Sequence, residues 1–591
     1  MKNRTKNYGM AITTIAFAAA AALYACGGDD STAGVTPGSD ASTDGSSGDG
    51  GGDGGPLQGD AGNPDGATSS CLGGNCSDVL TEHNDNARTG QYAVETKLNP
   101  TNVNMASFGK LFELPVDGKV DAEPLYVQNV AIGGGTHNVV YVVTEHDSLY
   151  AFDAETKPDA GTSQFWTVSA LAAGETPSDA VGGCSQVTPE IGITSTPVID
   201  LATKTIYLIA MSKNGGTYHQ RIHAIDITTG VEKAGSPKEV TATFPGTGQE
   251  GDGTTLTFDP KIHKERSALL LDHGQVWSSW SSHCDQGNYT GWLMAYDASS
   301  LAQTAVYNDE PNGSEAAFWS SGAGPAADSA GNIYHESGNG TFETTLDSTG
   351  HPNKGDYGNS FIKVALSGSS ISLVDYFTMG NEVVESAGDV DLSSGGLMLL
   401  PDSVGSAAHP HLLVGGGKDG HIYMLDRDNL GKFNTDGGNG QIAQDVPNAT
   451  YSGSPTGGVG SYGAPAYFNG AIYYGGVSES LKRWPIANGK ITTPQSSQTS
   501  TNFQYPGTTP SISYNGTDPA TAIVWAHENS TPPTLHAYSS ADLTTEYYNS
   551  NQATGQRDKP AGSGNKFIIP MIANGRVYVA TTNSVVVYGL L

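Results

Sequence analysis

Basic residues are scarce in this chain. Its 591 residues include 28 Lys and Arg against 60 Asp and Glu, which gives a formal net charge of −32. A polyanion of this size is repelled by phosphate backbones and anionic headgroups, so the charge argues against nucleic-acid binding and against electrostatic docking to a membrane. Apolar residues still make up 37% of the chain, which is enough to bury a large core.

Long hydrophobic runs are also missing. The apolar run at residues 11–24 is about fourteen residues long, whereas a membrane-spanning helix needs ~20. It follows Lys2, Arg4 and Lys6, so we interpret residues 1–25 as a secretion signal. Leu-Tyr-Ala-Cys26 resembles the bacterial lipobox, which predicts lipidation of Cys26 and a membrane contact made through that lipid alone.

Residues 26–70 lack the composition of a folded segment. Residues 27–70 contain no Lys or Arg and only one Val and one Leu; most of the others are Gly, Asp, Ser, Thr, Ala and Pro. Such a segment cannot bury enough apolar surface to fold, so it is predicted to be a disordered tether. Gly27 follows Cys26 where an Asp would resemble an inner-membrane retention signal, so we expect an exported lipoprotein of the outer membrane, on its periplasmic or cell-surface face.

Cysteines are few as well. Besides Cys26 there are four, namely Cys71, Cys76, Cys184 and Cys284. An even set in a secreted chain is typical of disulfides, and we expect one local pair and one long-range pair. These cysteines lack the clustered spacing of a zinc site.

What the chain does contain is an internal repeat. Each unit has an apolar opening, a Gly or Asn turn, alternating Tyr-Val-like residues and a second turn into a closing strand. Eight units begin at Glu123, Thr196, Ser267, Gly324, Gly396, Ala464, Thr509 and Ile569. Short strands with period-two alternation and Gly-rich turns predict antiparallel sheets in radial repetition.

The fold prediction is therefore an all-β, eight-bladed β-propeller over residues 105–591, preceded by a lead-in segment at 71–104. The last unit stops at its third strand, and residues 108–116 have the alternation of the missing outer strand. We expect that N-terminal strand to close the ring, which removes exposed sheet edges. His83 and Arg88 are expected to pin the N-terminal segment, and the propeller is expected to be monomeric.

The units resemble the PQQ-like repeat family, the quinoprotein alcohol dehydrogenase-like propellers. That family's signature is Ala-x-Asp-x-x-Thr-Gly followed by a Trp, and residues 224–230, AIDITTG, match its first seven positions. The docking Trp is irregular here. The resemblance covers about residues 105–591 and implies the fold, whereas the function has to be argued from the site.

The resemblance also implies candidate site residues. In the family's dehydrogenases PQQ and calcium are bound together. Asn339 in SGNG is similar to the Asn ligand of calcium, Asp356 in GDYGN is similar to the catalytic base, and Lys418 in GGGKDG is similar to the cation at the quinone oxygens. Taken singly, each of these motifs is more simply an ordinary β-turn.

Other elements of the family's site are absent. Gln286 stands where the Glu ligand would be, with Asp285 beside it as the substitute ligand. Gly324 replaces the stacking Trp, although Trp319 lies a few residues upstream. The chain has neither a Cys-Cys pair nor a Cys-x-x-Cys-His haem motif.

Further polar residues are expected to gather where the turns converge at one end. They are Glu123, Glu145, His146, Asp147, Glu190, His283, Asp285, Asn339, Lys418, Asp419, Glu479, His527 and Glu528. Such a funnel could hold a metal or a polar ligand. Asp389 and Asp391 form an acidic loop without EF-hand spacing and are interpreted as a plain turn.

Two main functions remain open from the sequence, besides a non-quinone enzyme that acts on sugars through the same polar funnel, which no residue singles out. The first is a tethered propeller lipoprotein that binds a small polar ligand or a protein, or serves as a scaffold, without being an enzyme. The alternative is a divergent PQQ- and calcium-dependent alcohol or sugar dehydrogenase, with Asp356 as base, Lys418 at the quinone, and Asn339 and Asp285 on calcium.

Overall fold

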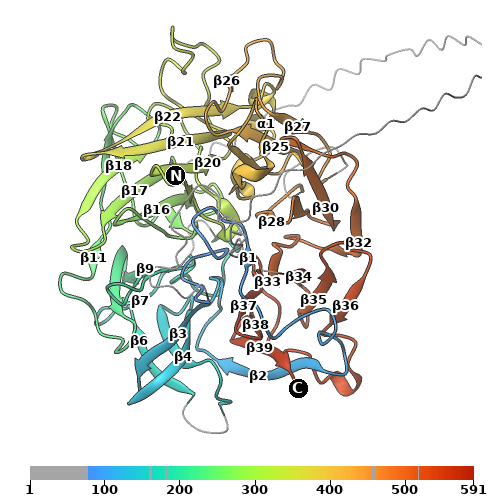
Figure 1. Cartoon of the computed structure of the whole chain (residues 1–591). Coiled ribbons are helices and arrows are strands. Elements are labelled where there is room, and N and C mark those ends of the chain that lie inside the picture. Colours follow the sequence, from blue (N-terminus) through green and yellow to red (C-terminus); the bar gives the residue numbers. More distant parts are fainter. Residues whose placement is uncertain (1–76, 159–162, 180–182, 452, 454–458, 517) are drawn as a thin grey trace, which may run out of the picture. The chain divides into compact units, whose positions relative to one another are not determined.

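The computed structural model describes residues 77–158, 163–179, 183–451, 453, 459–516 and 518–591. The predicted signal peptide, lipidation site, tether and local cysteine pair lie outside these residues. The described sheets follow one another around a central axis as eight blades, which confirms the predicted eight-bladed propeller (Figure 1). Within the described ranges, no helix has both the length and the apolar character needed to cross a membrane.

The first four blades are numbered in chain order, each from its inner to its outer strand. Blade 1 has β3 (Leu125–Ile132), β4 (Gly135–Val143), β5 (Ser148–Asp153) and β6 (Gln164–Ser169). Blade 2 has β8 (Val198–Asp200), β9 (Thr205–Asn214), β10 (Thr217–Asp226) and β11 (Lys238–Glu239), with β7 (Thr176–Pro177) on β9. Blade 3 has β15 (Leu270–Asp272), β16 (Gln275–Ser282), β17 (Trp292–Asp297) and β18 (Gln303–Asn308), with β14 (His263–Glu265) on β16. Blade 4 has β19 (Ala326–Ala327), β20 (Asn332–Glu336), β21 (Ser360–Ser367) and β22 (Ser370–Thr378), with β26 (Lys432–Phe433) at its edge.

The other four blades complete the ring. Blade 5 has β23 (Met398–Leu399), β24 (Leu412–Gly415), β25 (Ile422–Asp426) and β27 (Gln444–Val446). Blade 6 has β28 (Ala466–Phe468), β29 (Ala471–Gly475), β30 (Glu479–Ala487) and β32 (Ser497–Phe503), with β31 (Lys490–Ile491) on β30. Blade 7 has β33 (Ser511–Asn515), β34 (Asp518–Glu528), β35 (Thr534–Ser539) and β36 (Glu546–Asn549), with β1 (Gln91–Tyr92) on β33. Blade 8 has β37 (Met571–Ala573), β38 (Arg576–Ala580), β39 (Ser584–Leu590) and β2 (Phe108–Pro115).

Few elements lie outside the blades. They are the ribbon β12 (Thr243–Pro245) and β13 (Thr255–Thr257), the short helix α1 (Glu382–Ala387), and the 3-10 turns η3 (Ser320–Gly322), η4 (Leu392–Ser394), η5 (Asp402–Val404) and η6 (Thr554–Gln556).

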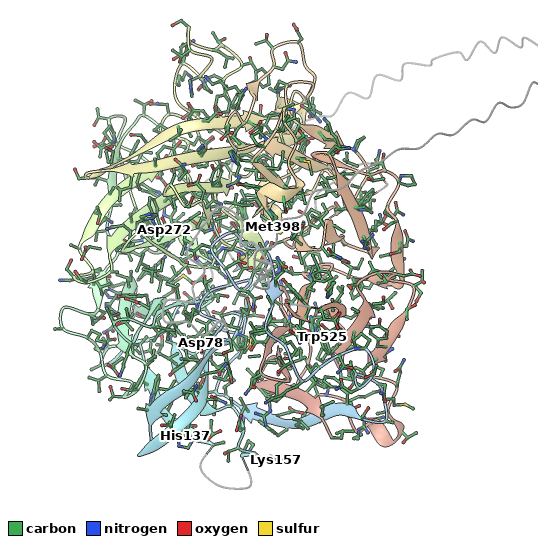
Figure 2. The ribbon with its side chains drawn as sticks, viewed as in Figure 1. Asp78, His137, Lys157, Asp272, Met398 and Trp525 are labelled. Carbon is green, nitrogen blue, oxygen red and sulfur yellow. A yellow bond between two sulfur atoms is a disulfide. The ribbon has the colours of Figure 1, made fainter. Side chains whose placement is uncertain are left out.

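Burial along the strands explains their sequence patterns. Strands β5 and β25 are buried at every residue because each blade packs between two neighbours, whereas the outer strand β6 has exposed and half-buried residues. Figure 2 shows Met398 near the middle of the ring and His137 at its outer margin. Strands buried on both faces are mostly apolar, whereas outer strands mix apolar and polar residues.

Two-residue turns with positive φ connect the inner strands to their neighbours. Asn469-Gly470 joins β28 to β29 with φ values of 45° and 74°, and Asn574-Gly575 joins β37 to β38 with 50° and 83°. These turns need positive φ at both positions, which Asn and Gly tolerate best. They account for the Gly and Asn spacing in the repeats.

The ring is closed by the N-terminal strand. β2 pairs antiparallel with β39, with Phe108 opposite Leu590 and Pro115 opposite Ser584. The prediction of closure by an outer strand at residues 108–116 is confirmed.

An N-terminal segment fills the axis. Residues 79–95, called here the axial segment, hydrogen-bond to all eight blades in order. From blade 1 to blade 8 the contacts are Val79 N–H and C=O with Tyr126, Ile199 N–H to Leu80 C=O, the Asn86 amide to Leu271 C=O, Ala327 N–H to Asn86 C=O, Leu399 N–H to Ala87 C=O, Tyr467 N–H to Thr89 C=O, Ile512 N–H to Gly90 C=O, and Gly575 N–H to the Glu95 carboxylate. The segment therefore satisfies backbone groups of inner strands that would otherwise face the channel.

Arg88 anchors the axial segment. Its guanidinium is fully buried and donates to the carbonyls of Glu82, Leu269 and Pro325, and its Nε lies 3.5 Å from the Glu82 carboxylate. Burial raises the pKa of Glu82 to about 7, and the charge of Arg88 opposes that rise. These contacts agree with the prediction that Arg88 pins the N-terminal segment.

Replacing Arg88 with Met tests this anchor. The change leaves three buried carbonyls without their donor and removes the positive charge beside the Glu82 carboxyl, so we expect the free energy of unfolding to fall by about 3–5 kcal/mol. Urea denaturation near neutral pH measures the loss. Lys238→Met, which removes an exposed cation from β11, is the control. A loss below ~1 kcal/mol for Arg88→Met would contradict the anchoring role.

Candidate functional site

A cavity of about 280 Å³ opens at one end of the propeller. The loops that precede the inner strands of blades 3 to 8 each contribute a side chain, and further loops add the rest. The lining residues are Gln186, Arg266, Asp285, Trp319, Ser321, Asp389, Asp391, Ser394, Lys418, Tyr462, Tyr505 and Phe567. Because inner strands of a propeller begin at the same end, these residues converge although they are far apart in the sequence.

Lys418, between β24 and β25, lies in the cavity wall with two carboxylates. Its Nζ is 2.5 Å from Asp391 Oδ2 and 2.9 Å from Asp389 Oδ1, and it also donates to the Asp389 carbonyl. Burial lowers the pKa of Lys418, but the two carboxylates outweigh burial and raise it above its ordinary value. The ammonium is therefore charged and already neutralised by the protein.

Asn339 is placed behind this ion pair. Its backbone N–H donates to Asp391 Oδ1 at 2.9 Å, and its side-chain Oδ1 is buried and has no hydrogen-bond partner in the described chain. Asn339 and Lys418 are thus joined through Asp391. Sequence reasoning interpreted Asp391 as part of a turn, whereas its carboxylate holds both residues.

Asp285 lines the cavity beside a disulfide. Tyr289 Oη donates to Asp285 Oδ1 at 2.7 Å, and the adjacent Cys284 is bonded to Cys184. This disulfide confirms the predicted long-range pair and ties the loop before β8 to the loop between β16 and β17.

Asp356 is not among the residues that line the cavity. It is fully buried in the loop before β21, where Oδ1 accepts the Asn312 N–H at 2.7 Å. Burial, and next the neighbouring Glu343 carboxyl, raise the pKa of Asp356 to about 8. The structure therefore brings Lys418, Asp285 and, indirectly, Asn339 together but leaves Asp356 apart.

Aromatic side chains form the rest of the wall. Tyr462 and Tyr505 meet edge to face with centroids 5.2 Å apart, and Tyr505 lies 6.4 Å from Phe567. Trp319 packs on Tyr289 at 6.1 Å, and its indole N–H is buried without an acceptor in the described chain.

Four of these wall residues were missed by sequence reasoning, and they share a position. Arg266, Tyr462, Tyr505 and Phe567 each stand a few residues ahead of an inner strand. Aligning the eight units on their first strand and inspecting the preceding loop would have singled them out.

The donors do not fit a calcium ion as they stand. Calcium takes six to eight oxygen ligands, several of them carboxylates. No group of three or more His, Cys, Asp or Glu able to hold a metal exists among the described residues, and Asp389 and Asp391 are occupied by Lys418. Asn339 and Asp285 as calcium ligands therefore stay a prediction.

Comparison with solved structures finds alcohol and methanol dehydrogenases among the matches. No protein-family model matches the chain, and neither does any curated protein. The quinohemoprotein alcohol dehydrogenase from Comamonas testosteroni matches with a TM-score of 0.56 and 14% identity, over 87% of this chain and 80% of that one. A europium-containing methanol dehydrogenase matches with a TM-score of 0.55 and 12% identity, over 88% and 99%.

The chain has the quinoprotein alcohol dehydrogenase fold. At these identities the likeness extends to the fold and no further. The quinoprotein-type propeller therefore positions the cavity, while the residues within it have to decide what it binds.

The protonation of Asp356 can be tested through stability. Its folded-state pKa of about 8 lies above the ordinary value of 3.8, so the folded protein holds a proton that the unfolded chain releases, and stability falls as pH rises through this window. Asp356→Asn has no such proton to lose. Between about pH 5 and about pH 9 we expect the free energy of unfolding of the variant, relative to that of wild type, to rise by ~1–3 kcal/mol in denaturant unfolding.

Asp436→Asn, an exposed residue beyond β26, is the control and should show no such gain. A pH-independent difference between Asp356→Asn and wild type would mean that Asp356 is ionised in the folded protein.

Proposed function

We propose that this quinoprotein-type propeller is a binding module that takes a small polar ligand in the axial cavity and does not carry out quinone chemistry. The observation that carries the proposal is the engagement of Lys418 by Asp389 and Asp391 inside an otherwise well-formed cavity. A concave site with aromatic walls and a few converging polar groups is the usual form of a small-molecule site.

Two further features support binding over catalysis. A general base has to be ionised near its working pH and within reach of the proton it takes. Asp356 is buried and does not line the cavity, so it does not meet the condition of reach. A lysine that serves a reduced quinone has to direct its charge at the quinone oxygens, whereas the charge of Lys418 is directed at two aspartates.

A divergent quinoprotein dehydrogenase is the second candidate. It is favoured by the presence of Lys418, Asp285 and Trp319 in one cavity of a fold shared with alcohol and methanol dehydrogenases. When bound, PQQ would supply the two-electron oxidising group. Lys418 would then hold the quinone oxygens, Asp285 and Asn339 would face calcium, and Trp319 would pack on the ring.

Adding PQQ and Ca²⁺ to the purified full-length chain separates the candidates. We expect no alcohol- or sugar-dependent dye reduction, because Lys418 is neutralised. We also expect Lys418→Ala to lower the free energy of unfolding by ~2–4 kcal/mol, since Asp391 is left buried and unpaired. Lys238→Ala is the surface control for that measurement. Dye reduction by wild type that Lys418→Ala abolishes would establish the dehydrogenase instead.

The cavity itself can be probed with fragments. Ligand-observed NMR with a mixed set of neutral, cationic and anionic aromatic fragments should detect binding to the full-length chain. Trp319→Ala removes part of the wall, so we expect it to weaken that binding several-fold. If no fragment binds, or if binding is indifferent to Trp319, the cavity is not a binding site.

We further propose that the protein is an outer-membrane lipoprotein. The proposal rests on the signal-like residues 1–25 and on Cys26. Cys26→Ser removes the only predicted lipid attachment point, so we expect the variant to shift from the membrane fraction to the soluble exported fraction and to lose incorporation of labelled fatty acid. Continued membrane association of Cys26→Ser would refute the anchor. Ser70→Ala is the matched control within the same segment.

A further inference from the structure

Of the two cations that line the cavity, Lys418 and Arg266, Arg266 is the one that has no counter-ion in the described chain. It precedes β15, is 7% exposed, and its guanidinium lies 4.9 Å from the Phe567 ring centroid. Its guanidinium donates one long hydrogen bond of 3.4 Å to Gln186 Oε1, and no Asp or Glu of the described chain comes within ion-pair distance. A guanidinium has five N–H donors, so most of them have no acceptor among the described residues.

The buried Arg88 shows what a satisfied arginine looks like in this protein. Arg88 donates to four oxygen atoms and has Glu82 beside it. Arg266 has neither feature, although it is nearly as buried. Burying a cation without a counter-charge costs folding free energy, and a bound anion would offset that cost.

Lys566 adds a second uncompensated cation at the same wall. Its Nζ lies 5.8 Å from the centroid of Tyr505, and no described carboxylate forms an ion pair with it. Burial, and next the charge of Arg266, lower the pKa of Lys566 to about 8. The Asp121 carboxyl favours the charged form of both cations but forms an ion pair with neither in the described chain, so this wall carries two cations without a paired acid in a chain of net charge −32.

Given the proposed function, a ligand site in this cavity, we propose that Arg266 binds the carboxylate of a small organic anion. The planar body of this anion packs on the aromatic wall of the cavity. A guanidinium fork matches a carboxylate with two parallel hydrogen bonds, and Phe567 fixes the plane of that fork. Tyr462, Tyr505 and Trp319 supply ring faces and edges for the body.

The acidic wall of the cavity limits how many negative groups the ligand carries. Asp285 and Asp389 lie on it near Lys418, and this single lysine neutralises the Asp389–Asp391 pair. A second anionic group placed on that wall would be repelled. The ligand therefore carries its negative group at the end that contacts Arg266. Its other end carries hydroxyl or amine donors, or no polar group.

The test compares acids with their neutral amides. Ligand-observed NMR on the full-length chain would use benzoate and naphthalene-2-carboxylate, each against its carboxamide, with inorganic phosphate as a non-aromatic anion. We expect each acid to bind at least about tenfold more tightly than its amide, and phosphate to bind more weakly than either acid.

Variants locate the charge that matters. Arg266→Gln should weaken binding of the acids by about ten- to a hundredfold and leave the amides unchanged, because it removes the charge and the fork. Arg266→Lys keeps the charge without the fork and should lie between. Lys261→Gln is the matched control, since Lys261 is exposed and its Nζ lies 5.5 Å from the Tyr218 centroid, outside the cavity.

Stability provides a second readout. If Arg266 serves a ligand, the melting temperature of ligand-free Arg266→Gln should equal or exceed that of wild type, because an uncompensated charge is removed. A clear fall in melting temperature would assign Arg266 a structural role and overturn the proposal. Equal binding of acids and amides, or acid binding that survives Arg266→Gln, would overturn it too.

The outcomes separate this inference from the proposed function. Binding of neutral or cationic fragments that depends on Trp319, without binding of the acids, leaves the binding module and overturns the anion site. Absence of binding by every fragment overturns both.

Discussion

Closure of the ring depends on the pairing of β2 with β39. The last blade lacks its own outer strand, and the register from Phe108 opposite Leu590 to Pro115 opposite Ser584 supplies it. A ring with an open blade would expose the edge of β39, and its neighbours would lose packing on one side. The lining residues of the cavity come from blades on both sides of this joint, so the site exists only while the joint holds.

The axial segment is the second constraint, and it acts on the channel. Inner strands of a propeller have a free edge toward the axis. Residues 79–95 exchange hydrogen bonds with every blade, and the buried Arg88 guanidinium donates to backbone carbonyls with the Glu82 carboxylate 3.5 Å from its Nε. The axial segment thus holds the inner strands together, and the loops that precede those strands line the cavity.

The fold could be predicted because each blade carries its own signal. Alternating strands separated by Asn-Gly turns specify the hairpins, and the strand at 108–115 has the same pattern, so blade number and closure follow from local physics. The site could be predicted only in part. Lys418 and Asp285 stand in recognisable motifs, but Asp389 and Asp391 look like turn residues until the ring places them beside Lys418.

Lys418 and Arg266, the two cations that line the cavity, differ in whether the protein neutralises their charge. Lys418 occupies the position expected from the family, yet Asp391 and Asp389 neutralise it. The uncompensated charge stands at Arg266, which no motif marks and whose aromatic partner Phe567 belongs to the loop before blade 8. Under the proposed anion site, an anion entering the cavity is attracted to the Arg266–Phe567 wall and repelled by Asp285, so these two charges orient the ligand.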